Sequence, residues 1–158
     1  MSGIRRNFLS VVRWLAPAVG LSACLAASGA AAQPVSVKDD RGRVVTLNRP
    51  VQRIVTLAPH LTELAYAAGA GEKLVGVARH SDYPPAAARI PQVGDAVRVD
   101  AEAVLALKPD LVLAWRSGNP PTEVGRLEQI GLPVLATEPA RLSDIPRLLR
   151  AIGTLAGT

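Results

Sequence analysis

The feature that most constrains the fold is a repeated order of segments that begins at residue 54. A short, continuous apolar run is followed by a loop and then by an amphipathic stretch, and this order recurs along the chain. The apolar runs cover residues 54–57, 74–78, 110–114 and 133–136. Continuous apolar runs are typical of strands buried on both faces, and their alternation with helices favours right-handed crossovers. The sequence therefore predicts an α/β fold, an open, mostly parallel sheet with helices on both faces.

Helix signals lie between these runs. Asp100 is placed to cap a helix that Pro109 ends, because an aspartate oxygen accepts from free backbone N–H groups and proline cannot continue a helix. Gly131 ends the helix that opens at residues 120–121. Ser143 is predicted to cap a last helix whose apolar side chains form one stripe.

A β-hairpin is predicted before the α/β unit. Residues 35–38 and 43–47 alternate apolar with polar side chains, and the turn Asp-Asp-Arg-Gly at residues 39–42 joins them. At 158 residues the chain suits one ordinary domain. We therefore assign residues 33–142 to one α/β lobe and residues 143–158 to the start of a further helix.

Residues 1–32 are interpreted as a secretory signal peptide. Arginines at positions 5, 6 and 13 give a positive start, an apolar run follows, and Ala-Ala-Ala at residues 30–32 is a cleavage site of the A-x-A kind. The apolar run contains Pro17 and Gly20 and is short of the ~20 strongly apolar residues that a membrane-spanning helix needs. We expect an exported chain in the periplasm.

Cys24, the only cysteine, leaves a second export route open. Leu-Ser-Ala-Cys at residues 21–24 resembles a lipoprotein cleavage site, which would lipidate Cys24 and anchor the product to a membrane. We favour soluble export, because the alanine site is an equally good cleavage site and no polar residues directly follow Cys24. Cleavage at residue 32 removes the thiol, which excludes disulfides, thiolate metal sites and cysteine nucleophiles.

The charge pattern argues against nucleic acid as a partner. The formal net charge is +5, but three of the 18 basic residues lie in the signal segment, and the remaining fifteen face 13 acidic residues with no basic block. Binding to phosphate backbones relies on a clustered basic surface.

The loops after the apolar runs hold the candidate functional residues. In open parallel sheets, ligands bind beyond the carboxyl ends of the strands. Those loops contain both histidines, His60 and His80, and two of the three aromatic residues that follow the signal segment, Tyr83 and Trp115. Tryptophan and tyrosine offer flat apolar area, and neighbouring prolines hold them in place before a ligand arrives. This pattern favours a non-catalytic binder of a bulky, partly apolar ligand.

Catalysis and metal binding are the competing interpretations. The chain has no G-x-S-x-G elbow and no phosphate loop, and His80, Ser81 and Asp82 are adjacent, which is poor geometry for a triad. A small exported hydrolase therefore remains the weaker alternative, and we assign no catalytic residue. His60 and His80 could approach one another, with Asp82 or Glu63 as a carboxylate ligand, but exposed loop histidines are commoner, so we assign no metal ligand and no cofactor.

Two stretches carry a resemblance to a known family. Ser-Asp-Tyr-Pro-Pro at residues 81–85, and Leu-Lys-Pro-Asp-Leu-Val at residues 107–112 with the following Trp115-Arg116, resemble the helical-backbone class of periplasmic substrate-binding proteins, and within it the cobalamin-binding component of an ABC importer. The match runs from about Pro34 to the end. It implies two α/β lobes joined by a long helix, with cobalamin or a related corrinoid held between them and delivered to an inner-membrane permease.

The resemblance also implies a set of site residues. Together with the aromatic argument it gives these ligand-binding positions: Pro59, His60, Leu61, His80, Tyr83 and Trp115. The best-known relatives carry Ala-Asn at residues 60–61, a tyrosine at position 80 and a tryptophan near Ala96, so this site is less aromatic than theirs. A haem- or iron-siderophore-binding protein of the same class is the alternative, since a histidine such as His80 can be an axial ligand to iron.

The resemblance assigns a partner-docking role to Glu102, which matches an exposed glutamate that pairs with permease arginines. The alternative is a carboxylate favoured by the helix dipole in a first turn, which is worth ~0.3–1 kcal/mol. Residues 143–158 would be the start of the interlobe helix. Because no second lobe follows, we expect a truncated chain or a fragment, and a monomer.

Overall fold

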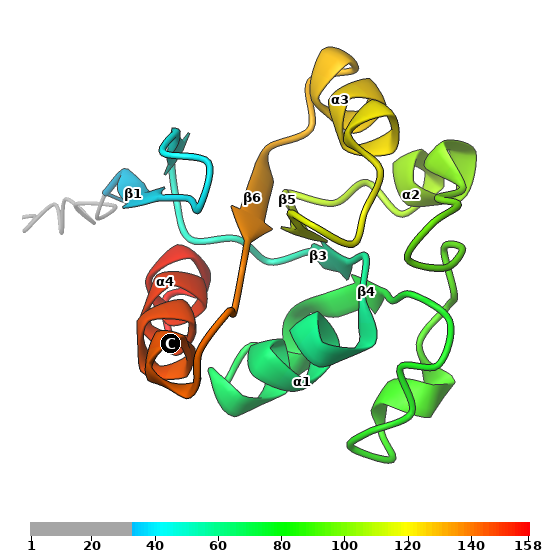
Figure 1. The fold of residues 1–158 in the computed structure, drawn as a ribbon, viewed down its shortest axis with the longest axis horizontal. Helices are drawn as coiled ribbons and strands as arrows, with labels where there is room; N and C mark the ends of the chain where they lie inside the picture. The colour runs from blue at the N-terminus through cyan, green and yellow to red at the C-terminus, as the bar shows by residue number, and fades with distance from the viewer. Residues whose placement is uncertain (1–32) are drawn as a thin grey trace, which may run out of the picture. The chain divides into compact units, whose positions relative to one another are not determined.

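A four-stranded parallel sheet lies at the centre of residues 33–158, the part of the chain that the computed structural model describes (Figure 1). Its strands lie in the order β4 (Leu74–Gly76), β3 (Ile54–Thr56), β5 (Leu111–Trp115) and β6 (Val134–Thr137). All neighbouring pairs are parallel. The chain moves outward from β3 to β4, then crosses back to β5 on the other side of β3. The predicted open parallel α/β sheet is confirmed, and it has a switch point between β3 and β5.

Each face of the sheet is covered by two helices. Side chains alternate between faces along a strand, so Leu113 of β5 enters one core and Val112 the other. The first core is closed by α1 (Pro59–Ala67) and α4 (Ile145–Ala156). The second is closed by α2 (Ala101–Ala106) and α3 (Pro121–Gln129). Helices on both faces are thus confirmed (Figure 1).

The predicted helix boundaries are correct except for the last one. The Asp100 carboxylate accepts from Ala103 N at 2.9 Å at the start of α2, and Gly131 follows α3 with φ +89°. The Ser143 cap is wrong. A 3-10 turn, η3 (Leu142–Asp144), precedes α4, and its Asp144 carboxylate accepts from Arg141 N at 2.9 Å. That local bond satisfies the turn, so the helix begins at Ile145.

The predicted hairpin is present and packs on the first core. Strands β1 (Val35–Lys38) and β2 (Val44–Leu47) pair antiparallel, with Val45 and Leu47 buried next to α4. Two further 3-10 turns, η1 (Gly71–Lys73) and η2 (Ala87–Arg89), lie in the connections before and after β4. The hairpin therefore extends the face that α1 and α4 already cover.

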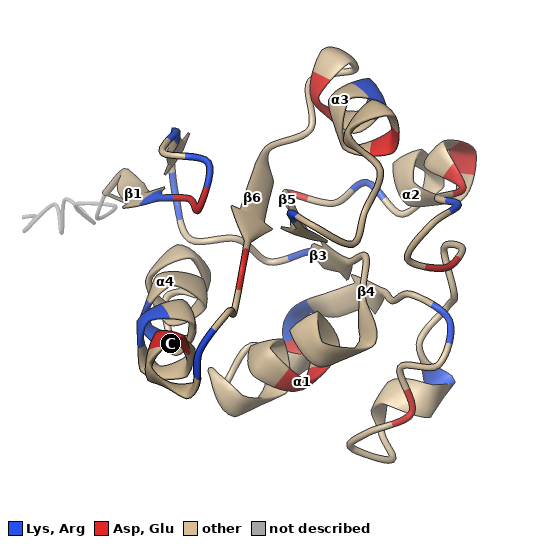
Figure 2. Cartoon of the chain, viewed as in Figure 1, with Lys and Arg blue, Asp and Glu red and all other residues tan. Residues whose placement is uncertain are grey.

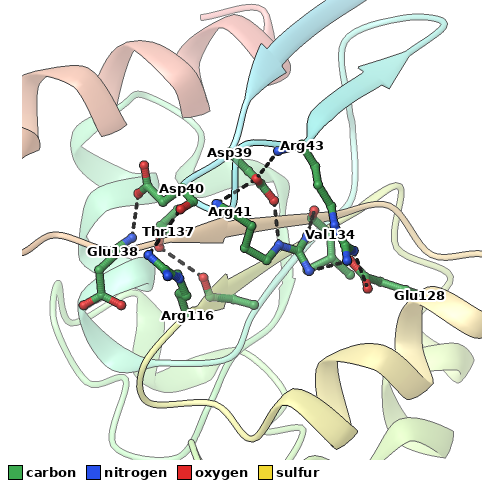
Figure 3. A network of polar contacts seen from close by, with 10 residues as sticks. Asp39, Asp40, Arg41, Arg43, Arg116, Glu128, Val134, Thr137 and Glu138 are labelled. Carbon is green, nitrogen blue, oxygen red and sulfur yellow. Dashed lines mark hydrogen bonds and ion pairs between the residues drawn. The ribbon is translucent and has the colours of Figure 1, made fainter.

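The hairpin turn is bound to the edge of the sheet by charged groups (Figure 3). The buried Asp39 carboxylate accepts from Arg41 N and Arg43 N at 2.9 Å each and pairs with Arg41 Nε at 2.7 Å. Arg41 also pairs with Glu128 of α3 at 2.7 Å and donates to Val134 O in β6 at 3.3 Å. An exposed edge strand is a site of unwanted pairing, and this turn covers part of it.

Asp40 joins the same turn to the segment after β6. Asp40 N donates to Ala136 O at 2.9 Å, and the Asp40 carboxylate accepts from Glu138 N at 2.6 Å. The carboxylate also pairs with Arg147 of α4 at 2.7 Å. One side chain therefore fixes the hairpin, the end of β6 and the first turns of α4 together.

Within residues 33–158, no helix combines the length and the apolar character that crossing a bilayer requires. The predicted signal peptide, its cleavage site and Cys24 lie outside the described residues. The interlobe role of residues 143–158 stays a prediction.

Asp39→Asn tests the charged anchor of the hairpin. Burial alone would raise the pKa of Asp39, but the hydrogen bonds from Arg41 and Arg43 and the charge of Arg41 outweigh burial, so its pKa lies below 3.8. A lowered carboxyl pKa gives stability that is present above pH 3.8 and is lost as the pH falls through the folded-state pKa. At pH 7 the free energy of unfolding of the variant, measured by urea denaturation, should be ~1–3 kcal/mol lower than that of the wild type. This difference should shrink below about pH 4. A constant difference down to pH 2 would contradict the ionic role.

Candidate functional site

A pocket lies at the carboxyl ends of β3 and β5, on either side of the switch point. Open parallel sheets bind ligands at such a point, because the loops there diverge to opposite faces. The pocket has a volume of about 590 Å³. We call it the Trp115 pocket, and its lining residues are His60, Glu63, Leu64, Ala67, Tyr83, Trp115, Glu138, Pro139 and Ile145.

An imidazole and an indole form one corner of the Trp115 pocket. The rings of His60 and Trp115 are T-shaped, with centroids 5.1 Å apart and planes at 86°. His60 Nε2 is buried and has no hydrogen-bond partner within the described residues. Burial lowers the pKa of His60, while the carboxylates of Glu63 and Glu138 oppose this change only in part. The corner is therefore a neutral, largely apolar surface.

Trp115 is held in place by the residues that follow it. Its backbone N–H donates to Asn119 Oδ1 at 2.6 Å. The Asn119 amide in turn donates to Leu57 O at 3.0 Å and to Ala96 O at 2.7 Å, which joins the ends of β5 and β3. The indole lies against Gly118, where a Cβ atom would come within 1.8 Å of the ring. The aromatic surface is thus ordered before any ligand binds.

A buried line of hydroxyl groups fixes the loop that carries Tyr83. Thr56 Oγ1 and Thr62 Oγ1 are 2.6 Å apart, and Thr62 Oγ1 donates to Ser81 Oγ at 3.1 Å. All three side chains are buried. The Ser81 hydroxyl is therefore used to attach its loop to β3 and α1, and Tyr83, 65% exposed, is left at the rim of the pocket.

The wall of the Trp115 pocket carries negative charge. Two of its nine lining residues are glutamates and none is lysine or arginine. Figure 2 shows these acidic positions on α1 and directly after β6. Glu138 is fixed twice, because its N–H donates to Asp40 and its carboxylate accepts from Ser117 Oγ at 3.0 Å. This wall would attract cations and N–H donors and repel carboxylates.

The structure brings three of the six predicted ligand-binding residues into this pocket. His60, Tyr83 and Trp115 line it. Pro59 is the half-buried first residue of α1, next to His60. Leu61 is fully buried in the first core and does not line the pocket.

Two other predicted residues lie outside the lining. His80 is exposed and has φ +66°, a left-handed conformation that is uncommon for histidine. Glu102 is exposed in the first turn of α2, on the helix layer that covers the second core. Within residues 33–158, no three histidine, aspartate or glutamate side chains are grouped in a way that would hold a metal ion.

Sequence reasoning did not assign their roles to the residues that shape and charge the pocket. Gly118 and Asn119 lie in the loop after β5 and are typical turn residues, so their position indicated a loop but not the two long-range hydrogen bonds that Asn119 donates. From sequence, Glu63 is considered only as a carboxylate for a metal site, and Glu138 only as part of the loop after the last apolar run. Only the placement of α1 beside the segment after β6 brings the two carboxylates to one wall.

Comparisons with known proteins agree with this architecture. A family model described as periplasmic binding protein matches residues 54–158. The vitamin B12-binding protein of Pectobacterium carotovorum is 48% identical over 103 residues, which cover 65% of this chain and 37% of that protein. The vitamin B12-binding protein of Vibrio cholerae is 45% identical, again over 103 residues, with the same coverage of 65% and 37%.

Solved structures of similar proteins include binders of different ligands. A periplasmic vitamin B12 binding protein of Vibrio cholerae has a TM-score of 0.66 at 43% identity, covering 68% of this chain and 42% of that chain. A periplasmic heme binding protein from Pseudomonas aeruginosa has a TM-score of 0.63 at 33% identity, covering 68% and 39%.

The family model covers most of the α/β unit, including β3, the switch point and α4. The chain spans 37% of the length of the vitamin B12-binding relatives. Because the family model matches more than half of the chain, the chain belongs to the periplasmic binding protein family.

Proposed function

We propose that this chain binds cobalamin or a related corrinoid in the periplasm, as the substrate-binding component of an ABC importer. The observation that carries the proposal is the Trp115 pocket: an ordered aromatic corner beside two carboxylates, with no cation in the lining. The vitamin B12-binding relatives, at 45–48% identity, support the same ligand. No bond is made or broken in this role, and no catalytic residue is needed.

The aromatic corner suits a large, flat ligand. A ring edge or face of the ligand would lie on the indole of Trp115, and the neutral imidazole of His60 would extend that surface. The pocket, at about 590 Å³, is smaller than a whole corrinoid, so it would hold one part of the ligand. Because Asn119 and Gly118 already fix the indole, little ordering entropy opposes binding.

The charge of the pocket favours a corrinoid over haem. Corrinoids carry peripheral amide groups, whose N–H groups can donate to the carboxylates of Glu63 and Glu138. Haem carries propionates, which the same carboxylates would repel. Tyr83 at the rim would contact the ligand edge. Pro59, at the start of α1, and His80, in the loop after β4, would contact the ligand only from outside the pocket, and the fully buried Leu61 would not touch it.

Delivery to the permease would use a different surface. Glu102 is exposed on α2, away from the residues of the Trp115 pocket, and an exposed charge of this kind speeds encounter with a partner of opposite charge. We propose that Glu102 docks against basic residues of the permease. A signal peptide over residues 1–32 would bring the monomeric chain to the periplasm, with Cys24 as the site of an alternative lipid anchor.

Trp115→Ala tests the aromatic contact. Titration with dicyanocobinamide should show a dissociation constant raised by about tenfold, or ~1.4 kcal/mol, because the stacking surface is lost. Val97→Ala removes an exposed apolar side chain outside the pocket and should leave the constant unchanged. Equal constants for the wild type and Trp115→Ala, with unchanged circular dichroism, would remove Trp115 from the site.

Glu63→Lys tests the discrimination between ligands. The substitution puts a cation on the pocket wall, so the affinity for haemin should rise relative to that for dicyanocobinamide by about threefold or more. Glu72→Lys makes the same charge change in η1, outside the pocket lining, and should leave the ratio of the haemin and dicyanocobinamide affinities unchanged. Wild-type protein that binds haemin more tightly than dicyanocobinamide would overturn the corrinoid assignment.

Glu102→Lys tests the docking surface. Binding of the chain to vesicles that carry the corrinoid permease should weaken, and added salt should weaken wild-type binding in the same direction. Glu123→Lys is the matched control, because Glu123 also lies in the first turn of a helix, α3. If both variants lost permease binding to the same extent, Glu102 would be assigned to helix stability alone.

A further inference from the structure

A second hollow of about 410 Å³ lies on the other face of the sheet and shares no lining residue with the Trp115 pocket. It is bounded by α3, the hairpin and the carboxyl ends of β5 and β6. We call it the Arg116 pocket after the residue that follows β5. Successive residues of a strand point to opposite faces, so Trp115 and Arg116 serve different pockets although they are adjacent. The β ladder continues to this point, because Arg116 N donates to Thr137 O at 2.9 Å.

The floor of the Arg116 pocket is made by small residues. Ala114 and Ala136 are the residues before the last in β5 and β6, and Gly125 lies above them in α3. A Cβ atom at Gly125 would meet no atom within 4 Å, so packing does not require glycine at this position. Glycine inside a helix costs ~0.5–1 kcal/mol relative to alanine. The hollow is thus left open at some expense to helix stability.

The lining of the Arg116 pocket has more cations than anions, although one of its arginines, Arg41, is also paired with the Asp39 carboxylate at 2.7 Å (Figure 3). Three arginines and one glutamate contribute to the lining. Both oxygens of Glu128 are used, by Arg41 at 2.7 Å and by Arg43 at 3.3 Å. Within residues 33–158, the side chain of Arg116 makes a single hydrogen bond, from Nη1 to Asp40 O at 3.4 Å. Most of its donors are therefore available to a ligand.

We propose that the Arg116 pocket binds a small organic carboxylate. The apolar body of the ligand would lie on Pro121 and Gly125, above the buried Ala114 and Ala136, and its carboxylate would receive the planar fork of Arg116, which matches a carboxylate in geometry and charge. The pocket is too small for an intact corrinoid, and the excess of cations in its lining disfavours a cationic ligand. The site therefore takes a different class of molecule from the Trp115 pocket, and it does not depend on the function proposed for that pocket.

The experiment uses 2-naphthoate as the probe, with the full chain, and measures binding by isothermal titration calorimetry. Gly125→Leu fills the hollow and should abolish binding, while melting at the same or a higher temperature, because leucine is a better helix former than glycine and its Cβ meets no atom within 4 Å. Arg116→Gln should weaken binding by about tenfold. The neutral analogue 2-naphthamide should bind at least tenfold more weakly than 2-naphthoate.

A reciprocal variant separates this site from the Trp115 pocket. Ala67→Leu narrows the Trp115 pocket, so it should lower the affinity for dicyanocobinamide and leave 2-naphthoate binding unchanged. Gly125→Leu should abolish 2-naphthoate binding and leave the affinity for dicyanocobinamide unchanged. The proposal is overturned if the wild type does not bind 2-naphthoate at millimolar concentration. It is also overturned if Ala67→Leu, and not Gly125→Leu, removes the binding.

Discussion

The pairing of β3 with β5 is the constraint on which the rest of the structure depends. Ile54, Val55 and Thr56 align with Leu111, Val112 and Leu113, although the paired residues are separated by about 57 positions in the chain. Both strands are buried on both faces, so a shift of register would move apolar side chains away from the two cores. In this register β5 extends two residues beyond the partner of Thr56, which brings its last residue, Trp115, to the height at which α1 begins. The start of α1 and Trp115 therefore meet at one edge, and a pocket forms between them.

Local signals in the sequence were sufficient for the elements. Apolar runs, the Asp100 cap and Gly131 gave the strands and most helix boundaries, because each depends on neighbours within a turn or two. The last helix shows where this fails: Ser143 fits the composition of a cap, but the Arg141–Asp144 bond forms a separate turn first. The site was less predictable. Aromatic scarcity pointed to Trp115 and Tyr83, whereas the two carboxylates of the wall meet only through the packing of elements far apart in the chain.

The hairpin shows how a segment outside the α/β unit shapes the site. From sequence, residues 39–42 are only a turn between two short strands. In the fold, Asp40 of this turn holds Glu138 N and Arg147, and Glu138 is one of the two acidic groups of the Trp115 pocket. The bond between Asp40 and Glu138 joins residues 98 positions apart. Such a bond has no local signature, because any turn tolerates aspartate and the partner is a backbone N–H group.

The two pockets lie on opposite faces of one sheet and differ in the charge of their linings. On one face, Glu63 and Glu138 lie beside neutral aromatic rings, and on the other, three arginines outnumber one glutamate, which pairs with Arg41 and Arg43. Strand β5 contributes to both, through Trp115 at its end and Arg116 directly after it. Because the Asn119 side chain accepts from Trp115 N, and Asn119 also lines the Arg116 pocket, the segment from 115 to 119 is shared. A ligand that displaced Asn119 on one face would therefore release the indole on the other.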